Sequence, residues 1–355
     1  MRIAYGVHGY GRGHSSRALA VLPELTARHD VLIFAGGDAF EALQDDYPVT
    51  RIPVFRYALK PDGTRSKLGT LRMAVPNLLD LRLNGPALQT VQDHLAAFRP
   101  DVVVTDSEAW THWACRRMKL PRISFDHFGV LVYCRWPMGP ADRLVSRGEA
   151  MVYRRLMAGG GDRHVIVSFH AAPPRAAGVQ VVGPVLRRVV REQTPTTGDY
   201  LLVYFSNGQA YYTPRVMEAL RAVRAPVVVY GAGRAGREGN IEFRPPSNVR
   251  FVEDLAAARA VFATAGNQLI SEAMHLRKAM LLIPQDCLEQ RLNAAAIEKM
   301  HIGMRASVHS VSAGRIEAFL SRRERFEESY PPPQADGRER SVRAIEQYAR
   351  ELAGK

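Results

Sequence analysis

Short runs rich in β-branched residues alternate with stretches of helical periodicity along nearly the whole chain. In the first half, strand-like runs occupy residues 2–7, 30–35, 101–105 and 122–126, and helix-like stretches occupy residues 14–28 and 107–118. Strands that alternate with helices form parallel sheets, because each helix carries the chain back across one face of the sheet. The pattern therefore predicts a doubly wound α/β domain.

A second series of the same kind follows an interruption at residues 187–198, where polar residues and proline replace the periodic pattern. Its expected strands are residues 200–205, 227–230, 249–252, 260–263 and 280–283, and its expected helices are residues 267–275 and 289–301. After a run of three prolines, a last helix is expected within residues 337–353. We therefore expect two Rossmann-like domains, at residues 1–190 and 198–330, with the last helix packed on the N-terminal domain.

Composition excludes several classes of protein. The 355 residues include 46% hydrophobic and 23% charged side chains, which excludes disordered and fibrous chains. No apolar run approaches the roughly 20 residues of a membrane span, and the first residues lack the features of a leader, so a cytoplasmic protein is expected. Cys115, Cys134 and Cys287 lie far apart without metal-ligand spacing, so we expect neither disulfides nor a metal site.

Positive charge is the unusual feature of the composition. Lysine and arginine outnumber aspartate and glutamate by 48 to 35, and residues 1–190 alone carry 25 basic against 16 acidic side chains. Such a surplus is typical of proteins that bind nucleic acid, an anionic membrane surface or a phosphorylated substrate, and also of arginine-rich surfaces without such a partner. The interleaved aromatic and basic residues of single-strand binders are missing, so we expect no nucleic-acid partner.

A glycine-rich turn, GYGRGHSSR at residues 9–17, connects the first expected strand to the first helix. A nicotinamide-binding fingerprint is not expected, because the third glycine stands one position early and His14 follows it. We interpret Gly11 and Gly13 as positions where an acceptor substrate approaches the backbone, and His14 as a candidate base at the helix start. The alternative is that His14 only packs or caps.

The turn after the strand at residues 101–105 reads Asp106-Ser107-Glu108. Open α/β sheets bind ligands at the carboxyl ends of their strands, and a carboxylate there can orient a histidine base. Asp106 is therefore a candidate partner of His14, and Glu108 a candidate acceptor contact. The alternative is that Asp106 or Ser107 only caps the following helix.

The most specific pattern lies in the C-terminal half. TAGNQLISE at residues 264–272 follows an expected strand and opens a helix, and EQRLNA at residues 289–294 opens the next one. Free backbone amides at Gly266, Asn267 and Gln268 suit a diphosphate. Glu272, one turn further, can accept hydrogen bonds from both hydroxyls of a ribose.

With FVED at residues 251–254 and the turn Ile283-Pro284-Gln285, these blocks resemble the nucleotide-sugar half of GT-B glycosyltransferases. The resemblance is to the UDP-glycosyltransferase family and to the peptidoglycan lipid-precursor N-acetylglucosaminyltransferases. RGHSSRAL at residues 12–19 is similar to the start of the UDP-glycosyltransferases, whose histidine is the catalytic base, and residues 102–125 resemble the strand that carries its aspartate partner. The resemblance implies two Rossmann-like domains facing each other across a cleft.

The resemblance also implies an inverting, metal-independent transfer of a sugar from a UDP- or dTDP-sugar to a hydroxyl acceptor, without a cofactor. It makes His14 the base and Asp106 its partner, in an acceptor-binding N-terminal domain. Its implied donor-binding residues are Ser206, Asn207, Gly208, Val252, Gly266, Asn267, Gln268, Glu272, Glu289 and Gln290. Thr264 departs from the pattern, because many UDP-glycosyltransferases have a phosphate-binding histidine there, so the backbone amides and the turn at residues 206–208 are expected to hold the diphosphate.

Two segments combine basic and apolar residues. Lys60, Arg65, Lys67, Arg72 and Arg82 flank residues 71–83, and Arg143, Arg147, Arg154 and Arg155 alternate with Leu144, Val145, Met151, Val152, Leu156 and Met157. A membrane-surface helix has this pattern, and so does a core-facing helix with a solvated arginine face. The first interpretation predicts a lipid or lipid-linked acceptor at the cytoplasmic face of a membrane, and the second leaves a soluble small-molecule acceptor. A UDP-sugar 2-epimerase of the same fold and a non-catalytic nucleotide-sugar sensor remain as further alternatives.

Overall fold

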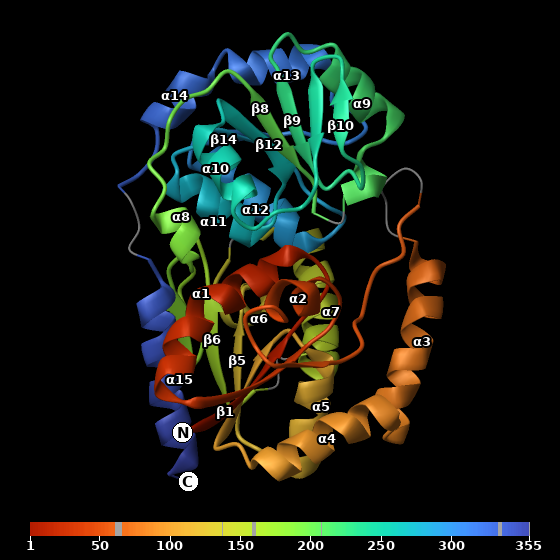
Figure 1. Ribbon diagram of the computed structural model, residues 1–355, viewed down its shortest axis with the longest axis vertical. Helices are drawn as coiled ribbons and strands as arrows, with labels where there is room; N and C mark the ends of the chain where they lie inside the picture. Colours follow the sequence, from red (N-terminus) through yellow and green to blue (C-terminus); the bar gives the residue numbers. More distant parts are fainter. Residues whose placement is uncertain (61–65, 137, 158–160, 207, 333–335, 355) are drawn as a thin grey trace. The chain divides into compact units, whose positions relative to one another are not determined.

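The computed structural model describes residues 1–60, 66–136, 138–157, 161–206, 208–332 and 336–354. The chain forms two units, each with its own seven-stranded sheet (Figure 1). Unit 1 contains Met1–Tyr57, Lys67–Arg187 and Ala335–Lys355, and unit 2 contains Ala58–Ser66 and Arg188–Gln334. The division after Arg187 falls where the periodic sequence pattern is interrupted.

The sheet of unit 1 is parallel throughout, with the strand order β3-β2-β1-β4-β5-β6-β7. Its strands are β1 (Arg2–Val7), β2 (Asp30–Ala35), β3 (Val49–Arg51), β4 (Val102–Asp106), β5 (Arg122–Asp126), β6 (Arg163–Val167) and β7 (Val179–Val182). The chain runs outward from β1 to β3 and then returns to the other side of β1 with β4. The crevice at such a reversal, at the carboxyl ends of the strands, is where open α/β sheets bind ligands.

Helices cover both faces of this sheet, as a parallel sheet requires. The helices of this unit are α1 (Arg12–Arg28), α2 (Gly37–Leu43), α3 (Lys67–Leu83), α4 (Pro86–Phe98), α5 (Ala109–Met118), α6 (Gly129–Tyr133), α7 (Pro140–Leu156) and α15 (Arg338–Ala353). Successive strand residues point to opposite faces. Tyr5 and Val7 therefore belong to the core under α1 and α15, whereas Ala4 belongs to the core under α4 and α5.

The last helix, α15, lies alongside α1 in unit 1 (Figure 1). Val342 and Ile345 on α15 are fully buried in the same core as Val21 of α1. Full burial of each such aliphatic side chain contributes about 1.5–3 kcal/mol. The Arg28 guanidinium also lies 2.8 Å from the Glu346 carboxylate. The end of the chain is thereby held to unit 1.

The sheet of unit 2 has the strand order β10-β11-β9-β8-β12-β13-β14, and only β10 is antiparallel to its neighbour. Its strands are β8 (Leu201–Tyr204), β9 (Val227–Tyr230), β10 (Gly236–Glu238), β11 (Ile241–Arg244), β12 (Ala260–Thr264), β13 (Met280–Ile283) and β14 (Gly303–Arg305). Its helices are α8 (Arg188–Arg191), the 3₁₀ turn η1 (Gly208–Tyr211), α9 (Pro214–Arg221), α10 (Arg250–Ala257), α11 (Asn267–His275), α12 (Leu288–Lys299), α13 (Ala313–Leu320) and α14 (Arg323–Glu328). The reversal in strand order falls between β8 and β12.

One expected strand is wrong, because residues 249–252 begin helix α10 instead. Val252, Leu255 and Ala256 are its buried residues, and their spacing of three and four is the helical period. The Val252 N–H donates to the Val249 carbonyl at 2.9 Å, so this segment forms a turn of helix where a sheet ladder was expected. A short β-branched run was mistaken for a strand, since the apolar residues that follow it continue a helical face.

Every helix of the described residues is too short or too polar to cross a bilayer. The three cysteines are buried and form no disulfide. Across the described ranges, no three or more histidine, cysteine, aspartate or glutamate side chains gather closely enough to hold a metal ion.

Candidate functional site

The turn after β1 brings the amino end of α1 to the carboxyl edge of the first sheet. Gly11 immediately precedes α1 with a φ of 85°, a conformation that favours glycine, and its N–H donates to the Asp38 carboxylate at 2.9 Å. A Cβ on Gly9 would lie 1.8 Å from the Gly36 carbonyl oxygen. Glycines 9 and 11 thus shape the turn itself, and acceptor binding by Gly11 and by Gly13, in the first turn of α1, stays a prediction.

His14 and Asp106 meet at the reversal between β1 and β4, as the sequence predicted for a base and its carboxylate partner. Asp106 is the last residue of β4 and pairs with Val7 of β1 in the sheet register. The His14 Nδ1 atom lies 2.7 Å from the Asp106 Oδ1 atom. The His14 side chain keeps 25% of its surface exposed, whereas Asp106 is fully buried.

Arg17, which the sequence analysis did not single out, completes this arrangement. Its Nε donates to Asp106 Oδ2 at 2.8 Å and its Nη2 donates to Oδ1 at 2.5 Å, a bidentate pair. The Arg17 Nη2 atom lies 3.1 Å from His14 Nδ1 because both groups bind the same carboxylate oxygen. Arg17 stands three residues after His14 on α1, so the two side chains share a helix face. That spacing was the available signal in the sequence.

The electrostatics of this cluster keep Asp106 ionised. Burial alone raises the pKa of Asp106, but the charge of Arg17, the charge of His14 and the hydrogen bonds from both lower this pKa below its ordinary value. An ionised Asp106 favours the His14 tautomer that carries its proton on Nδ1. The Nε2 atom then has a free lone pair, and no described residue is hydrogen-bonded to it. This is the arrangement that a general base requires.

Glu108, the expected acceptor contact, caps helix α5, and a contact of its side chain with an acceptor stays a prediction. It precedes α5, and its carboxylate accepts hydrogen bonds from the Trp110 N–H at 2.8 Å and from the Thr111 N–H at 2.7 Å. The side chain is buried, and its second oxygen also accepts from the Thr111 hydroxyl at 2.6 Å. Glu108 is therefore the cap of this helix. Asp106 or Ser107 was the expected alternative for this role.

In unit 2, the candidate diphosphate site lies at the start of α11, after β12. Gly266 precedes the helix, and the first N–H groups of a helix have no partner within it. Asn267 is only 5% exposed, yet neither its Nδ2 nor its Oδ1 atom has a hydrogen-bond partner among the described residues. Buried amide groups are nearly always paired, so this one indicates a ligand at the helix start.

Glu272 lies one turn further along α11 and is buried. The Gln268 Nε2 atom donates to its Oε1 atom at 3.1 Å. The spacing of four residues places both side chains on one helix face. A ribose contact at Glu272 stays a prediction, with Gln268 positioning the carboxylate.

Three loops at the carboxyl edge of this sheet are tied together by side chains. The Ser206 N–H donates to the Thr264 hydroxyl at 3.1 Å, and the Gln285 Nε2 atom donates to the Ser206 carbonyl at 2.6 Å. Gln290 accepts from the N–H groups of Ala265 at 3.1 Å and Gln285 at 3.0 Å, and donates to the Gln285 side chain at 2.8 Å. Gln290 therefore holds these loops together, and its donor contact stays a prediction.

The remaining donor candidates divide into three groups. Glu289 is half-buried and accepts from Asn293, so its sugar contact stays a prediction. Val252 is fully buried within α10, so its side chain is part of the packing of the unit. Gly208 begins η1, and Asn207 lies outside the described residues, as does the basic residue Arg65.

Comparisons with known proteins agree with the resemblance to glycosyltransferases that the sequence shows. A model of the family described as glycosyl transferase family 1 matches residues 1–323. No match was found among curated proteins. The solved glycotransferase of kitacinnamycin is 18% identical, with 99% of each chain covered and a TM-score of 0.68. MurG from Acinetobacter baumannii is 15% identical, with 98% of this chain and 99% of MurG covered and a TM-score of 0.59.

A third solved structure is that of Phytolacca americana UGT2 complexed with UDP-2fluoro-glucose and pterostilbene. It is 14% identical, with 99% of this chain and 93% of that chain covered and a TM-score of 0.59. Identities this low show the fold alone. The structural matches extend along nearly the whole chain and confirm the predicted α/β class with two Rossmann-like sheets.

Proposed function

The chain belongs to glycosyl transferase family 1 and is a glycosyltransferase, and on this premise we propose that it moves a sugar from a UDP- or dTDP-sugar to a hydroxyl acceptor with inversion at the anomeric carbon. The acceptor is assigned to unit 1 and the donor to unit 2. The observation that carries the proposal is His14, which is held by Asp106 at the strand reversal of unit 1 with Nε2 unoccupied by any described residue.

The proposed reaction is a single displacement. The acceptor oxygen bonds to the anomeric carbon while its proton passes to His14 Nε2, and the bond from that carbon to the diphosphate oxygen breaks with its electron pair on the diphosphate. Asp106 stabilises the imidazolium that forms, through the hydrogen bond at Nδ1. The proton then leaves His14 to solvent.

The start of α11 supports the assignment of the leaving diphosphate to unit 2. The N–H groups of its first turn, which have no partner within the helix, and the positive end of the helix dipole stabilise the negative charge that the diphosphate acquires. The unpartnered amide of Asn267 supplies donors in the same place. The UDP-2fluoro-glucose held by the similar UGT2 structure supports a uridine diphosphate sugar as donor.

Substitution of Glu272 tests the donor assignment. We expect Glu272→Ala to weaken binding of UDP or dTDP by about 1.5–3 kcal/mol, the range for hydrogen bonds to a charged group. Titration calorimetry measures this affinity, and circular dichroism checks that the variant folds. Glu218→Ala, an exposed glutamate on α9, is the matched control and should bind as the wild type does. Equal affinities of the wild type, Glu272→Ala and Glu218→Ala would show that Glu272 does not bind the donor.

Helix α3 supports a lipid or lipid-linked acceptor. Leu81 is its one buried residue, which contradicts the interpretation of this segment as a core-facing helix. Leu68 is 79% exposed and Leu83 is 73% exposed, and five other large apolar residues of α3 are also exposed: Leu71, Met73, Val75, Leu78 and Leu79. Figure 1 shows α3 in orange. The helix packs against α4, and Asp80 and the Leu81 carbonyl accept hydrogen bonds from Trp110 and Arg117 of α5.

Basic side chains accompany this apolar surface. Lys67, Arg72 and Arg82 are exposed on α3. An exposed helix that combines leucines with basic residues suits the interface of an anionic bilayer, where each lysine or arginine contributes about 1 kcal/mol. We therefore favour an acceptor presented at a membrane surface over a soluble small molecule, with peripheral and reversible binding of the enzyme.

Vesicle sedimentation tests the membrane assignment. We expect the wild type to sediment with phosphatidylglycerol vesicles and not with phosphatidylcholine vesicles, and to be released by roughly 0.5 M salt because salt screens the charges. Leu71→Ser/Leu79→Ser should abolish sedimentation, because these leucines are the proposed anchors. Val249→Ser, an exposed apolar residue of unit 2, should not change it. Absence of binding at low salt would favour the soluble acceptor.

A further inference from the structure

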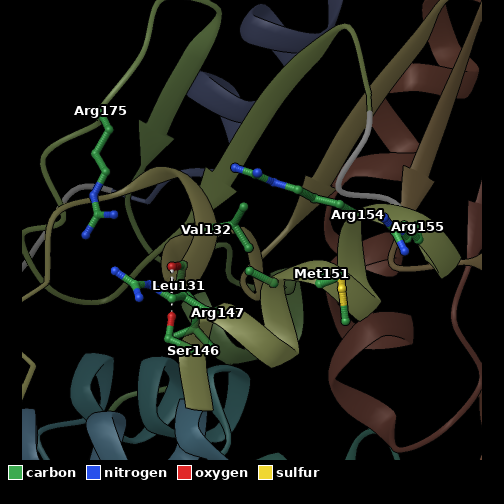
Figure 2. A pocket seen from close by; sticks show the side chains of 9 residues that line it. Leu131, Val132, Ser146, Arg147, Met151, Arg154, Arg155 and Arg175 are labelled. Atoms are coloured by element: carbon green, nitrogen blue, oxygen red, sulfur yellow. Dashed lines mark hydrogen bonds between the residues drawn. The ribbon is translucent and has the colours of Figure 1, made fainter. Parts of the chain in front are cut away.

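A pocket of about 410 Å³ in unit 1 is not used by the proposed reaction. It lies between α6 and α7, and four arginines line it (Figure 2). Arg147, Arg154 and Arg155 come from α7, and Arg175 comes from the loop between β6 and β7. The other described residues that line it are serine or apolar, so no carboxylate is among them.

The sequence of α7 gathers these arginines by helical spacing. Arg147, Met151 and Arg154 follow one another at four and three residues and therefore share a helix face. Ser146 beside them is buried, and its hydroxyl lies 3.4 Å from the Leu131 carbonyl of α6, which helps to fix this face against α6. Figure 2 shows the guanidinium groups of Arg147 and Arg175 pointing toward each other.

The four arginines lack a carboxylate partner in the part of the chain that the structure describes. Within the described ranges, none of the four guanidinium groups forms an ion pair with a carboxylate, although Arg154 lies over the Tyr133 ring at 5.3 Å. Like charges gathered at one pocket repel one another, and an anion between them relieves that repulsion. The planar fork of arginine matches the oxygen atoms of a phosphate group better than a lysine does.

Helix α7 is also tied to the candidate active site. The hydroxyl of Tyr153, the residue before Arg154, donates to the Asp126 carboxylate at the end of β5. Strand β5 pairs with β4, which ends at Asp106. A group bound in the arginine pocket therefore lies against the helix that contacts the same carboxyl edge of the sheet as the His14 site.

We propose that the arginine pocket binds a phosphate or diphosphate group attached to an amphiphilic ligand. This inference rests on the proposed function, since it identifies the acceptor side of unit 1 as a place for a phosphorylated lipid. Met151 in the pocket and the exposed apolar residues Leu144, Val145 and Val152 elsewhere on α7 offer contacts to its hydrocarbon part. The phosphate belongs either to the acceptor itself or to a phospholipid headgroup, and both share this chemistry.

Calorimetry with inorganic pyrophosphate, in the presence of UDP to occupy the donor site, tests the pocket. We expect Arg147→Gln and Arg175→Gln each to weaken binding by about tenfold to a hundredfold, because each removes a charged hydrogen bond. Arg143→Gln removes the same charge from α7 outside the pocket and should bind as the wild type does. Equal losses in all three variants would indicate only a general surface charge, and no loss at Arg147 and Arg175 would equally overturn the proposal.

Vesicles distinguish the two sources of the phosphate. Both outcomes that follow presuppose the loss of pyrophosphate binding. If Arg147→Gln also loses the preference of the wild type for phosphatidic acid over phosphatidylcholine vesicles, the pocket holds a phospholipid headgroup. If that preference is retained, the pocket holds the phosphate of the acceptor. Failure of UDP and dTDP to bind at all would instead overturn the donor assignment, and the pyrophosphate result does not depend on it.

Discussion

We expect His14→Ala to lower the turnover of sugar transfer by about 10²–10⁴-fold, the usual contribution of a positioned general base. The reason is geometric, because Asp106 holds the Nδ1 side of the ring and leaves Nε2 to receive the acceptor proton. The measurement is the initial rate of nucleoside diphosphate release with any hydroxyl acceptor that the wild type uses. The affinity for UDP should stay unchanged, since His14 belongs to unit 1 and the proposed donor residues to unit 2.

Two further measurements separate a base from a packing residue. Added imidazole should restore part of the turnover of His14→Ala, because a free base can enter the space that the side chain leaves. His309→Ala, an exposed histidine of unit 2, is the matched control and should keep wild-type turnover. Turnover of His14→Ala within a few-fold of the wild type would leave His14 as a residue that packs beside His8, whose ring centroid lies 5.0 Å away.

The part of the fold that follows from local pattern could be predicted from the sequence. Strands β1, β2, β5, β9 and β13 were expected with the bounds that the structure gives them. Except for β2, whose first three residues are exposed or half-buried, these strands are fully or nearly fully buried between glycine, proline or polar turns, so the apolar run and its ends coincide. The prediction of a strand at residues 249–252 was wrong because four residues are too few to show a helical period, and the helix becomes recognisable only from the residues that follow.

The candidate site shows a similar division. The proximity of His14 and Asp106 could be predicted because both lie at the carboxyl ends of strands, which meet at one edge of a sheet. The capping by Glu108 and the bracing by Gln290 could not be predicted, because each depends on which backbone N–H groups lie within reach of a side chain. The sequence places carboxylates and amides at strand ends, but it does not show whether they face a ligand or the protein's own loops.

We expect Arg17→Met to lower the free energy of unfolding by about 3–5 kcal/mol, the loss that follows removal of one partner from a buried ion pair. Arg17 and Asp106 are both almost fully buried, so the remaining carboxylate would lose its bidentate partner in a place that water does not reach. Asp106→Asn should destabilise the chain for the same reason, with Arg17 as the unpaired charge. Urea unfolding measures both effects, and Arg51→Met, which breaks an exposed pair with Glu41, should cost much less.

The double substitution Arg17→Met/Asp106→Leu separates stability from catalysis. Replacement of a whole buried ion pair by apolar residues is often neutral, so this chain should recover much of the stability that either single substitution loses. Its turnover should stay low, because His14 would still lack the carboxylate that sets its tautomer. If turnover recovers together with stability, Asp106 serves only as the counter-charge of Arg17 and is not a partner of the base.

The pH dependence of the same variants gives an independent check. The pKa of Asp106 is lowered in the folded chain, so its contribution to stability is fully present above the ordinary carboxyl pKa of about 4 and is lost as the pH falls through the lowered value. The difference in unfolding free energy between the wild type and Arg17→Met should therefore be constant near neutral pH and shrink in acid. A difference that persists unchanged as the pH falls through this lowered pKa would mean that the side chain of Arg17 stabilises unit 1 by packing alone, since a protonated Asp106 no longer attracts its charge.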